Sequence, residues 1–381
     1  MHLINLENLE ALEPRVSVIW SGSSTECRLE APLFVIGSAS QKFIDHHKNS
    51  HAMFPAPAIY AIDDAEVHGL GAVCWDNFVV GGDGWPGLSS LTEPGPRFLG
   101  QSANDYFQNA ASARTRRRID GVALLLARPG DNIYGHWLID IFPIVWLTMV
   151  RAGLGVKYIL RNDAPEYAVA WLQAVGASTS DIIFYDPKAD ILEVEQLLVA
   201  PGLRRGNFVH PALREYRDWF EIMAALKPNR SRDGDRKIFI SRKAWSSPNR
   251  QLLNRSTIEA QFLQRGFEVY QPERDPLQRQ IATFREARLV VGESGSGLHH
   301  NIFSSPNTIV GVLVARNRWS LIQSSLCAVF GQRIAYATGE PFLRPNFRGF
   351  AAIAPYVVAP EVIDQFLDRL EAAMEQGDVR V

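Results

Sequence analysis

The feature that most constrains this chain is an alternation of apolar, strand-length runs with helix-length segments, which begins at Gly121. The first run, residues 121–128, is continuously apolar, as is typical of a strand buried on both faces of a parallel sheet. Further strands are predicted at 157–161, 181–185 and 196–200, with a helix at 168–176. This rhythm favours an α/β fold with a parallel sheet.

A second alternation begins after Gly206. It predicts strands at 237–241, 267–270, 289–292, 308–314 and 333–338, and helices at 213–226, 254–265, 296–303, 318–330 and 360–375. Asp275 and Pro276 are expected to open another helix as its N-cap and first residue. The first hundred residues instead show short β-like runs punctuated by glycine and proline, at 16–19, 33–36, 58–62, 73–75 and 78–80.

The length of 381 residues points to more than one hydrophobic core, because single cores stop growing near ~250–300 residues. We expect two Rossmann-like α/β domains facing each other across a cleft, one in residues 1–206 and the other in 207–358. Ligands of open parallel sheets bind at the carboxyl ends of the strands. Residues 359–381 are expected to form a helix that packs back on the N-terminal domain through the apolar stripe Val362, Ile363, Phe366, Leu367 and Leu370.

Composition narrows the class of protein. The net charge of −2 gives no general attraction to nucleic acid, so no nucleic-acid partner is expected. The three cysteines have no CxxC spacing, which argues against a cysteine metal site or a disulfide framework and fits a reducing compartment. Acidic residues stand where a signal peptide would be basic, and the most apolar stretch, 137–150, is shorter than the roughly 20 residues of a membrane span. We expect a cytoplasmic protein, with peripheral membrane contact left open.

Two ionisable side chains lie in the apolar segment that follows the 121–128 strand. His136 and Asp140 are four residues apart, so on a helix they share one face. In apolar surroundings such groups have displaced pKa values, and one of them can serve as a general base. The alternative, which the spacing leaves open, is a buried pair that only orients the helix. Their place at the carboxyl edge of a sheet favours a functional role.

Two further strand–helix junctions suit an anion. Arg242 directly follows the 237–241 strand and Arg250 lies shortly after it; the planar guanidinium fork matches phosphate oxygens. The turn from Gly292 to Gly297 joins a strand to a helix, and between them stand Glu293, Ser294, Gly295 and Ser296. Glycine-rich turns let backbone N–H groups and a helix N-terminus approach an anion closely. This turn lacks the third glycine of GxGxxG, so a dinucleotide fold is not supported.

An ordered series of motifs runs through residues 120–315. It comprises Ser241-Arg242, Arg250, Leu253-Asn254, Gly266-Phe267, Pro272-Glu273, Gln280, Phe284, Val290-Val291-Gly292, Gly295-Ser-Gly297-Leu298, Phe303 and Pro306-Asn-Thr308. Upstream of these stand Gly135-His136-Trp137, Asp140 and Pro143. The series resembles glycosyltransferase family 61. Ser294 stands where many members have a histidine, so we assign no catalytic histidine to that turn.

The resemblance implies a GT-B fold and an inverting, metal-independent transfer from a nucleoside-diphosphate sugar, UDP-linked in characterised relatives, without a cofactor. Residues 207–358 would bind the donor. Without a metal, Arg242, Arg250 and the 292–297 turn would stabilise the departing diphosphate electrostatically.

Residues 1–206 would then hold the acceptor, a saccharide or lipid-linked saccharide. The resemblance also suggests a role in surface polysaccharide synthesis. We assign Asp140 as the base and His136 as its orienter or an acceptor contact, with the reverse assignment left open. Further contacts on the acceptor side are expected from Asn132, Tyr134 and Trp137.

Metal-dependent chemistry has weaker support. Asp233 and Asp235 lie in a polar segment before a strand, which is typical of a turn rather than of a metal-binding strand end. His46, His47 and His51 are expected in a solvated loop, because no carboxylate or cysteine pattern accompanies them.

A serine hydrolase centred on Ser294 is not supported. The fifth position of its nucleophile motif is Ser296 rather than glycine, and no histidine follows His300 to complete a triad. The remaining alternative is a non-catalytic nucleotide-sugar-binding protein of the same fold, which would keep Arg242 and the glycine turn but lose the His136–Asp140 pair.

Overall fold

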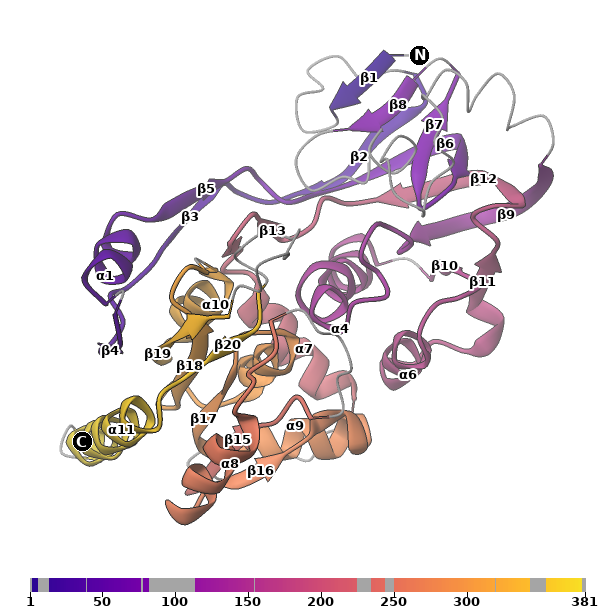
Figure 1. Ribbon diagram of the computed structural model, residues 1–381. Helices are drawn as coiled ribbons and strands as arrows, with labels where there is room; N and C mark the ends of the chain where they lie inside the picture. Colours follow the sequence, from indigo (N-terminus) through magenta and orange to yellow (C-terminus); the bar gives the residue numbers. More distant parts are fainter. Residues whose placement is uncertain are drawn as a thin grey trace. The chain divides into compact units, whose positions relative to one another are not determined.

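The chain forms two compact units in a computed structural model that describes residues 2–5, 14–38, 40–76, 78–81, 114–153, 155–224, 234–243, 250–318, 320–342 and 354–378 (Figure 1). Unit 1 comprises Met1–Thr25, Met53–Arg205 and Asp218–Ala224. Unit 2 comprises Glu26–Ala52, Gly206–Arg217 and Ala225–Val381. The division is therefore discontinuous, whereas the sequence predicted one boundary at residue 206.

The described part of unit 1 is built on a nine-stranded sheet whose second half is parallel. Strands β9 (Thr115–Leu125), β10 (Lys157–Arg161), β11 (Ile182–Tyr185) and β12 (Asp190–Val199) lie in the order β12-β9-β10-β11. Numbered along the chain, this is 3-2-1-4 read from β11, the order of a Rossmann half-sheet. The four apolar runs predicted here are thus confirmed as strands of a parallel sheet.

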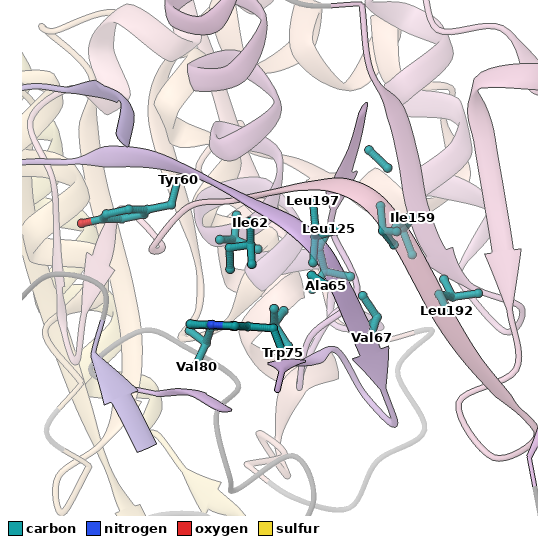
Figure 2. Close-up of a cluster of buried hydrophobic side chains, with 14 of the residues drawn as sticks. Tyr60, Ile62, Ala65, Val67, Trp75, Val80, Leu125, Ile159, Leu192 and Leu197 are labelled. Atoms are coloured by element: carbon teal, nitrogen blue, oxygen red, sulfur yellow. The ribbon is translucent and has the colours of Figure 1, made fainter. Parts of the chain in front are cut away.

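The other half of this sheet is mostly antiparallel. It contains β1 (His2–Asn5), β2 (Val16–Ser21), β6 (Ala58–His68), β7 (Ala72–Trp75) and β8 (Phe78–Gly81). Strand β6 joins the halves by pairing antiparallel with β12. Figure 2 shows the core on this sheet, where Tyr60, Ile62 and Trp75 share a cluster with Leu125 and Leu197. Unit 1 is therefore a mixed sheet and resembles a Rossmann domain only in its second half.

An uninterrupted helical stretch, residues 134–152, follows β9 after a loop. It consists of α4 (Tyr134–His136), the π-helix η4 (Trp137–Ile141), α5 (Phe142–Leu147) and the π-helix η5 (Thr148–Ala152). Helix α6 (Glu166–Ala174) and the 3-10 helix η6 (Thr179–Asp181) connect the next strands. Phe142 packs edge-on against Trp171 with ring centroids 5.1 Å apart, which holds the stretch against α6.

Unit 2 contains a second, mainly parallel sheet. Its strands are β15 (Arg236–Ile240), β16 (Glu268–Tyr270), β17 (Ala287–Glu293), β18 (Ile309–Ala315) and β19 (Arg333–Pro341), in the order β16-β15-β17-β18-β19, with β20 (Tyr356–Val357) beyond them. All but the β19–β20 pair are parallel. Numbered along the chain, the order is 2-1-3-4-5, which reverses direction between β15 and β17.

Helices cover both faces of this sheet, as its continuously apolar strands require. On one face, α8 (Arg255–Gln264) and α11 (Pro360–Asp378) share a core with alternate strand residues such as Leu289 and Val291. The other helices of this unit are α9 (Leu277–Arg285) and α10 (Ile322–Phe330), and its 3-10 helices are η7 (Pro272–Arg274) and η8 (Ser296–Phe303). Helix α7 (Leu213–Met223) is divided, with its residues up to Arg217 in unit 2 and those from Asp218 in unit 1. The predicted helix after Asp275 begins one residue late, with Pro276 as its N-cap.

Helix α11, which we expected to pack back on the N-terminal domain, belongs to unit 2 and contributes to its core. Its predicted apolar stripe is indeed buried, with Ile363, Phe366, Leu367 and Leu370 all in the unit 2 core. One face of the second sheet provides the apolar surface that this amphipathic helix needs.

Residues 26–52 also join unit 2, against the predicted boundary. Strand β4 (Val35–Ile36) pairs parallel with β19, and β3 (Thr25–Arg28) pairs with β5 (His51–Phe54). Helix α1 (Ser40–Lys48) contains His46 and His47, so the predicted solvated loop is wrong for these two. His47 is fully buried; its ring nitrogens lie 2.8 Å from Phe43 O and 2.7 Å from Ser324 Oγ.

Short strands β13 (Arg204–Arg205) and β14 (Phe208–Val209) pair with each other beside the boundary between the units. Asp233, one half of the aspartate pair considered above, lies outside the described residues. In the parts of the chain that are described, no helix is both long enough and apolar enough to cross a membrane.

Candidate functional site

The reversal of strand order between β15 and β17 marks where unit 2 is expected to bind a ligand. In open parallel sheets a ligand crevice is expected outside the carboxyl ends of two such strands. Arg242 follows β15 and the glycine-rich turn follows β17, and the two meet: Arg242 Nη1 lies 3.5 Å from Ser294 O. The structure thus brings together two segments that the sequence singled out separately.

The glycines of this turn have different tasks. A Cβ at Gly292 would lie 2.9 Å from Ile240 Cβ, and one at Gly297 would lie 3.0 Å from Ile240 Cγ2, so both allow the turn to pack on β15. A Cβ at Gly295 would lie 3.3 Å from Arg242 Nη1, so its absence makes room for the guanidinium. Gly295 also precedes Ser296, where η8 begins, and the first N–H groups of a helix lack intrahelical partners. Donors of two kinds therefore converge here.

Glu293, which the sequence placed among the phosphate-binding residues, is already paired within the protein. Its side chain is almost fully buried, and Arg255 Nε donates to its Oε1 at 2.7 Å. The Leu252 N–H lies 3.3 Å from its other oxygen. A buried carboxylate would repel phosphate, so the structure argues against the predicted phosphate-binding role and assigns Glu293 to holding β17 against the start of α8.

Arg250 lines a pocket at the carboxyl ends of β17 and β18, together with Ser294, Leu313, Val314, Ala315, Arg318, Ala354 and Tyr356. Its φ of 60° is in the left-handed region, which non-glycine residues rarely adopt. Burial, followed by the positive charge of Arg242, lowers the pKa of Arg250. The positive charges of the two predicted arginines therefore repel each other, as is typical of groups that bind an anion.

Arg318 was not predicted from the sequence. It stands just after β18 and lines the same pocket as Arg250. Burial, followed by the charge of Arg250, lowers its pKa to about 10. The signal that found Arg242, an arginine shortly beyond the carboxyl end of a buried parallel strand, marks both Arg316 and Arg318 here. Only the structure separates the exposed Arg316 from Arg318, which lines the pocket.

A second polar cluster lies in unit 1, after the carboxyl ends of β9 and β12. These strands are numbers 1 and 4 of the 3-2-1-4 order, so this is the switch point of the parallel half-sheet. His136 Nδ1 lies 2.6 Å from Asp140 Oδ2, which confirms that the two share one helical face. Arg204, which follows β12, donates through Nε to Asp140 Oδ1 at 2.6 Å and through Nη2 to Oδ2 at 2.9 Å. Arg204 was missed because nothing near it in the sequence points to Asp140.

The His136 ring is fixed by its neighbours. Gly130, with φ of 87°, lies beneath it, and a Cβ there would sit 3.5 Å from His136 Cδ2. The π-helix η4 begins at the residue after His136. In an ordinary α-helix, Pro143 would leave one hydrogen bond unmade and its ring would crowd the carbonyl four residues earlier. This accounts for the wider turn of the π-helix. Because a carboxylate only accepts hydrogen bonds, the contact with Asp140 requires the proton on Nδ1. The neutral ring then has its lone pair on Nε2.

Asp140 is held as an ionised, doubly paired carboxylate. Burial raises its pKa, but hydrogen bonds from His136 and Arg204 outweigh burial, and the pKa lies below the ordinary aspartate value. The side chain of Asp140 is only 10% exposed, whereas that of His136 is 37% exposed. Of the two, His136 is the group that solvent or a second molecule can reach.

The three residues predicted on the acceptor side have different environments. Asn132 is exposed, and Tyr134 is partly buried with its ring edge-on to Tyr167 at 5.1 Å. Trp137 is fully buried and packs near Phe142. A fully buried indole does not reach an acceptor, so the structure argues against that role for Trp137 and leaves Asn132 and Tyr134 as candidates.

The loop that precedes the helix of His136 is held by a buried ion pair. Arg161, at the end of β10, donates through Nε to Asp131 Oδ2 at 2.8 Å, and its Nη2 lies 2.6 Å from Oδ1. In the described parts of the chain, no group of three or more His, Cys, Asp or Glu side chains could hold a metal ion.

Comparison with known families agrees with this geometry. Residues 134–311 match the profile of the family described as Glycosyltransferase 61, a span that includes His136, Arg242, Arg250 and the glycine turn and ends before Arg318. A search of curated proteins found no match to the chain. The resemblance read from the motifs is confirmed over residues 134–311, which match the family described as Glycosyltransferase 61.

Proposed function

We propose that this chain is an inverting, metal-independent glycosyltransferase of the GT-B type. Unit 2 would bind a nucleoside-diphosphate sugar, with UDP as the first nucleotide to test, and unit 1 would bind a saccharide or lipid-linked saccharide acceptor. The observation that carries the proposal is the meeting of Arg242 with the Ser294–Gly297 turn at the switch point of the second sheet. Cytoplasmic location and peripheral membrane contact stay predictions.

The donor half of the proposal rests on charge. A departing nucleoside diphosphate carries negative charge that must be stabilised as the glycosidic bond breaks, and preorganised donors do this most effectively. Arg242 and the N-terminus of η8 supply such donors from two neighbouring strand ends, and Arg250 adds a second guanidinium. The arrangement supports diphosphate stabilisation by protein groups.

On the acceptor half, the geometry favours His136 over Asp140 as the base, the reverse of the assignment favoured by the sequence. Both oxygens of Asp140 already accept hydrogen bonds, and its lowered pKa makes it a weak base. His136 keeps its Nδ1 proton on Asp140, and its Nε2 lone pair can accept another. Asp140 then sets the tautomer and stabilises the imidazolium that forms, a division of labour known from other His–Asp pairs.

In the proposed step, His136 Nε2 takes the proton of the acceptor hydroxyl while that oxygen bonds to the anomeric carbon. The bond from this carbon to the diphosphate oxygen breaks on the opposite face, and its electron pair leaves with the diphosphate. Attack opposite the leaving group inverts the anomeric centre. As expected for a GT-B enzyme, the carboxyl edges of the two parallel sheets would face each other when both substrates are bound.

The test is turnover with a panel of UDP-, GDP- and dTDP-sugars and a saccharide panel, measured by nucleotide release. We expect one nucleotide series to react, activity to survive excess EDTA, and the product anomer, read by NMR, to be inverted. Arg242→Gln should weaken nucleotide binding by about 10- to 100-fold, because charge-assisted hydrogen bonds contribute ~1.5–3 kcal/mol. Arg279→Gln, at an exposed arginine of α9, is the matched control.

Three results would contradict parts of this proposal separately. Retention of the anomeric configuration would overturn inversion, and loss in EDTA restored by manganese would overturn metal independence. Tight nucleotide binding with no turnover on any acceptor would favour the non-catalytic nucleotide-sugar-binding alternative.

A further inference from the structure

Arg318 follows the carboxyl end of β18 and lines the pocket of unit 2. Its strand, β18, pairs in register with β17, so their carboxyl ends lie side by side. Its backbone N–H bonds to Ala315 O, which turns the chain back over the strand end. The Arg318 side chain lines one pocket with Arg250 and Ser294, the residue whose carbonyl Arg242 contacts.

The guanidinium of Arg318 is incompletely satisfied. Its Nη1 is buried and has no hydrogen-bond partner among the described residues. Buried polar atoms in native proteins are nearly always paired, and an orphaned one calls for a specific explanation such as a missing ion. An unpaired donor on a charged group is more costly still, because the charge has also lost water.

The surroundings of Arg318 add positive charge rather than cancel it. Arg250 and Arg242 both act on it repulsively. Among the described residues that line the pocket there is no carboxylate. The neighbouring Glu293 is occupied by Arg255, and the Tyr356 hydroxyl donates to Leu313 O at 3.2 Å.

We propose that Arg318 is a diphosphate ligand of the donor, which it binds together with Arg250 and Arg242. The inference rests on the proposed function and extends it, because it adds a cation beyond the matched family span. Three guanidiniums match a nucleoside diphosphate better than a monophosphate, since the second phosphate brings further charge and further acceptor oxygens. Arg318 therefore selects for the diphosphate.

A purely structural arginine predicts the opposite effect on stability. If Arg318 held the fold together, its removal would lower the melting temperature of the ligand-free protein. If Arg318 instead binds a ligand, its removal from the ligand-free protein eliminates charge repulsion and a buried donor without a partner. That protein should then melt at the same or a higher temperature. Stability and binding thus separate the two roles.

The experiment compares the full-length wild type with Arg318→Met, Arg318→Lys and Arg316→Gln. Arg316 is a neighbouring arginine whose exposed side chain pairs with Glu340, so its variant is the matched control. Calorimetric titrations with UDP, UMP, GDP, GMP, dTDP, dTMP and inorganic pyrophosphate give the affinities, and thermal melts without ligand give the stabilities. The wild type should bind its preferred diphosphate at least about ten-fold more tightly than the matching monophosphate.

For Arg318→Met we expect diphosphate affinity to fall by about 10- to 100-fold, monophosphate affinity to change much less, and the melting temperature to stay or rise. Arg318→Lys should be intermediate, because lysine keeps the charge but loses the planar fork. Unchanged diphosphate affinity in Arg318→Met, or a fall in melting temperature that Arg316→Gln does not show, would overturn the inference. If the wild type binds none of the probes, the proposed function itself fails; if Arg242→Gln loses binding while Arg318→Met does not, only this inference fails.

Discussion

At the scale of single residues, the pairing of Asp140 changes what a carboxylate in an apolar helix can do. Sequence spacing identified His136 and Asp140 as partners but could not rank them, because their roles depend on which other groups reach them. Arg204 arrives from a strand end 64 residues away and occupies both oxygens. The ranking therefore came from tertiary structure.

The assignment of the base is testable by its pH dependence. A base must be deprotonated to work, so activity is lost as pH falls through its pKa. If Asp140 were the base, kcat/KM would persist to below the ordinary aspartate range, because its pKa is lowered. We expect instead that kcat/KM is lost before that range is reached, and that turnover falls by about 10²–10⁴-fold in His136→Gln.

The control for this prediction is nucleotide affinity, since His136 lies in unit 1 and the proposed donor groups lie in unit 2. A calorimetric titration with UDP should give wild-type affinity for His136→Gln. Wild-type turnover in a folded His136→Gln variant would rule out the imidazole as the base.

At the scale of elements, the contact between η8 and α9 places a histidine where protonation is costly. His300 stacks on Phe284 with ring centroids 4.9 Å apart, and its Nε2 lies 2.7 Å from Gln280 Oε1. Burial lowers its pKa from 6.5 to about 4. Between pH 6.5 and about 4, His300 is therefore protonated in the unfolded chain but neutral in the folded protein.

The sign of the effect on stability follows from this difference. The contribution of neutral His300 is fully present above about pH 6.5 and is lost as pH falls towards 4. From these values, the free energy of unfolding should drop by about 2 kcal/mol between pH 7.5 and pH 5 through this residue alone. Urea denaturation at the two pH values should show a smaller drop for His300→Gln.

The matched control is His51→Gln, because His51 is exposed on β5. Its variant should keep the full pH-dependent drop. An equal drop in wild type and His300→Gln would contradict the burial of a neutral imidazole in η8.

Elements were predicted best where one local pattern suffices. The predicted runs are continuously apolar at 121–125 in β9, 158–160 in β10, 289–292 in β17 and 309–315 in β18, and burial on both faces of a parallel sheet demands that pattern. The π-helix η4 was not predicted, because it depends on how Pro143 is accommodated in a helix whose other side chains are fixed by packing. Arg318 was missed because a lone arginine after a strand has no meaning until the sheet order places it beside Arg250.

At the scale of the whole molecule, α11 closes the core of unit 2 chiefly through Phe366. The ring packs edge-on to Phe34 at 5.8 Å, and a Cβ at Gly311 would come within 3.0 Å of it. Phe366→Ala should destabilise the protein by about 3–5 kcal/mol, the usual cost of emptying such a site. Hydrogen exchange should accelerate in peptides from β17 and β18 more than in those from β9 and β12.

The control is Ile222→Ala in α7, where the side chain is 77% exposed and little should change. Equal acceleration of exchange in both sheets would show that α11 supports unit 1 as well, in line with the original expectation for this helix.

The domain boundary could not be predicted because it depends on a pairing between distant segments. Val35 lies opposite Tyr336 in the β4–β19 pair, and neither stretch carries a local sign of the other. The hydrophobic periodicity of a segment indicates which of its faces is buried, but it does not indicate which other segment covers that face. The fold class was therefore predictable, whereas the assignment of residues 26–52 to unit 2 was not.

That pairing has a consequence for how the chain emerges from the ribosome. Thr338 Oγ1 bonds to Ile36 O across 302 positions of sequence. At ~5–20 residues per second, the β4 segment waits roughly 15–60 s after synthesis for its partner strand. Throughout that interval Phe34 and Phe43, buried in the finished protein, have no sheet to cover them. We therefore expect the nascent segment to expose apolar surface during synthesis, and a fragment that starts at residue 206 lacks the β4 strand that pairs with β19.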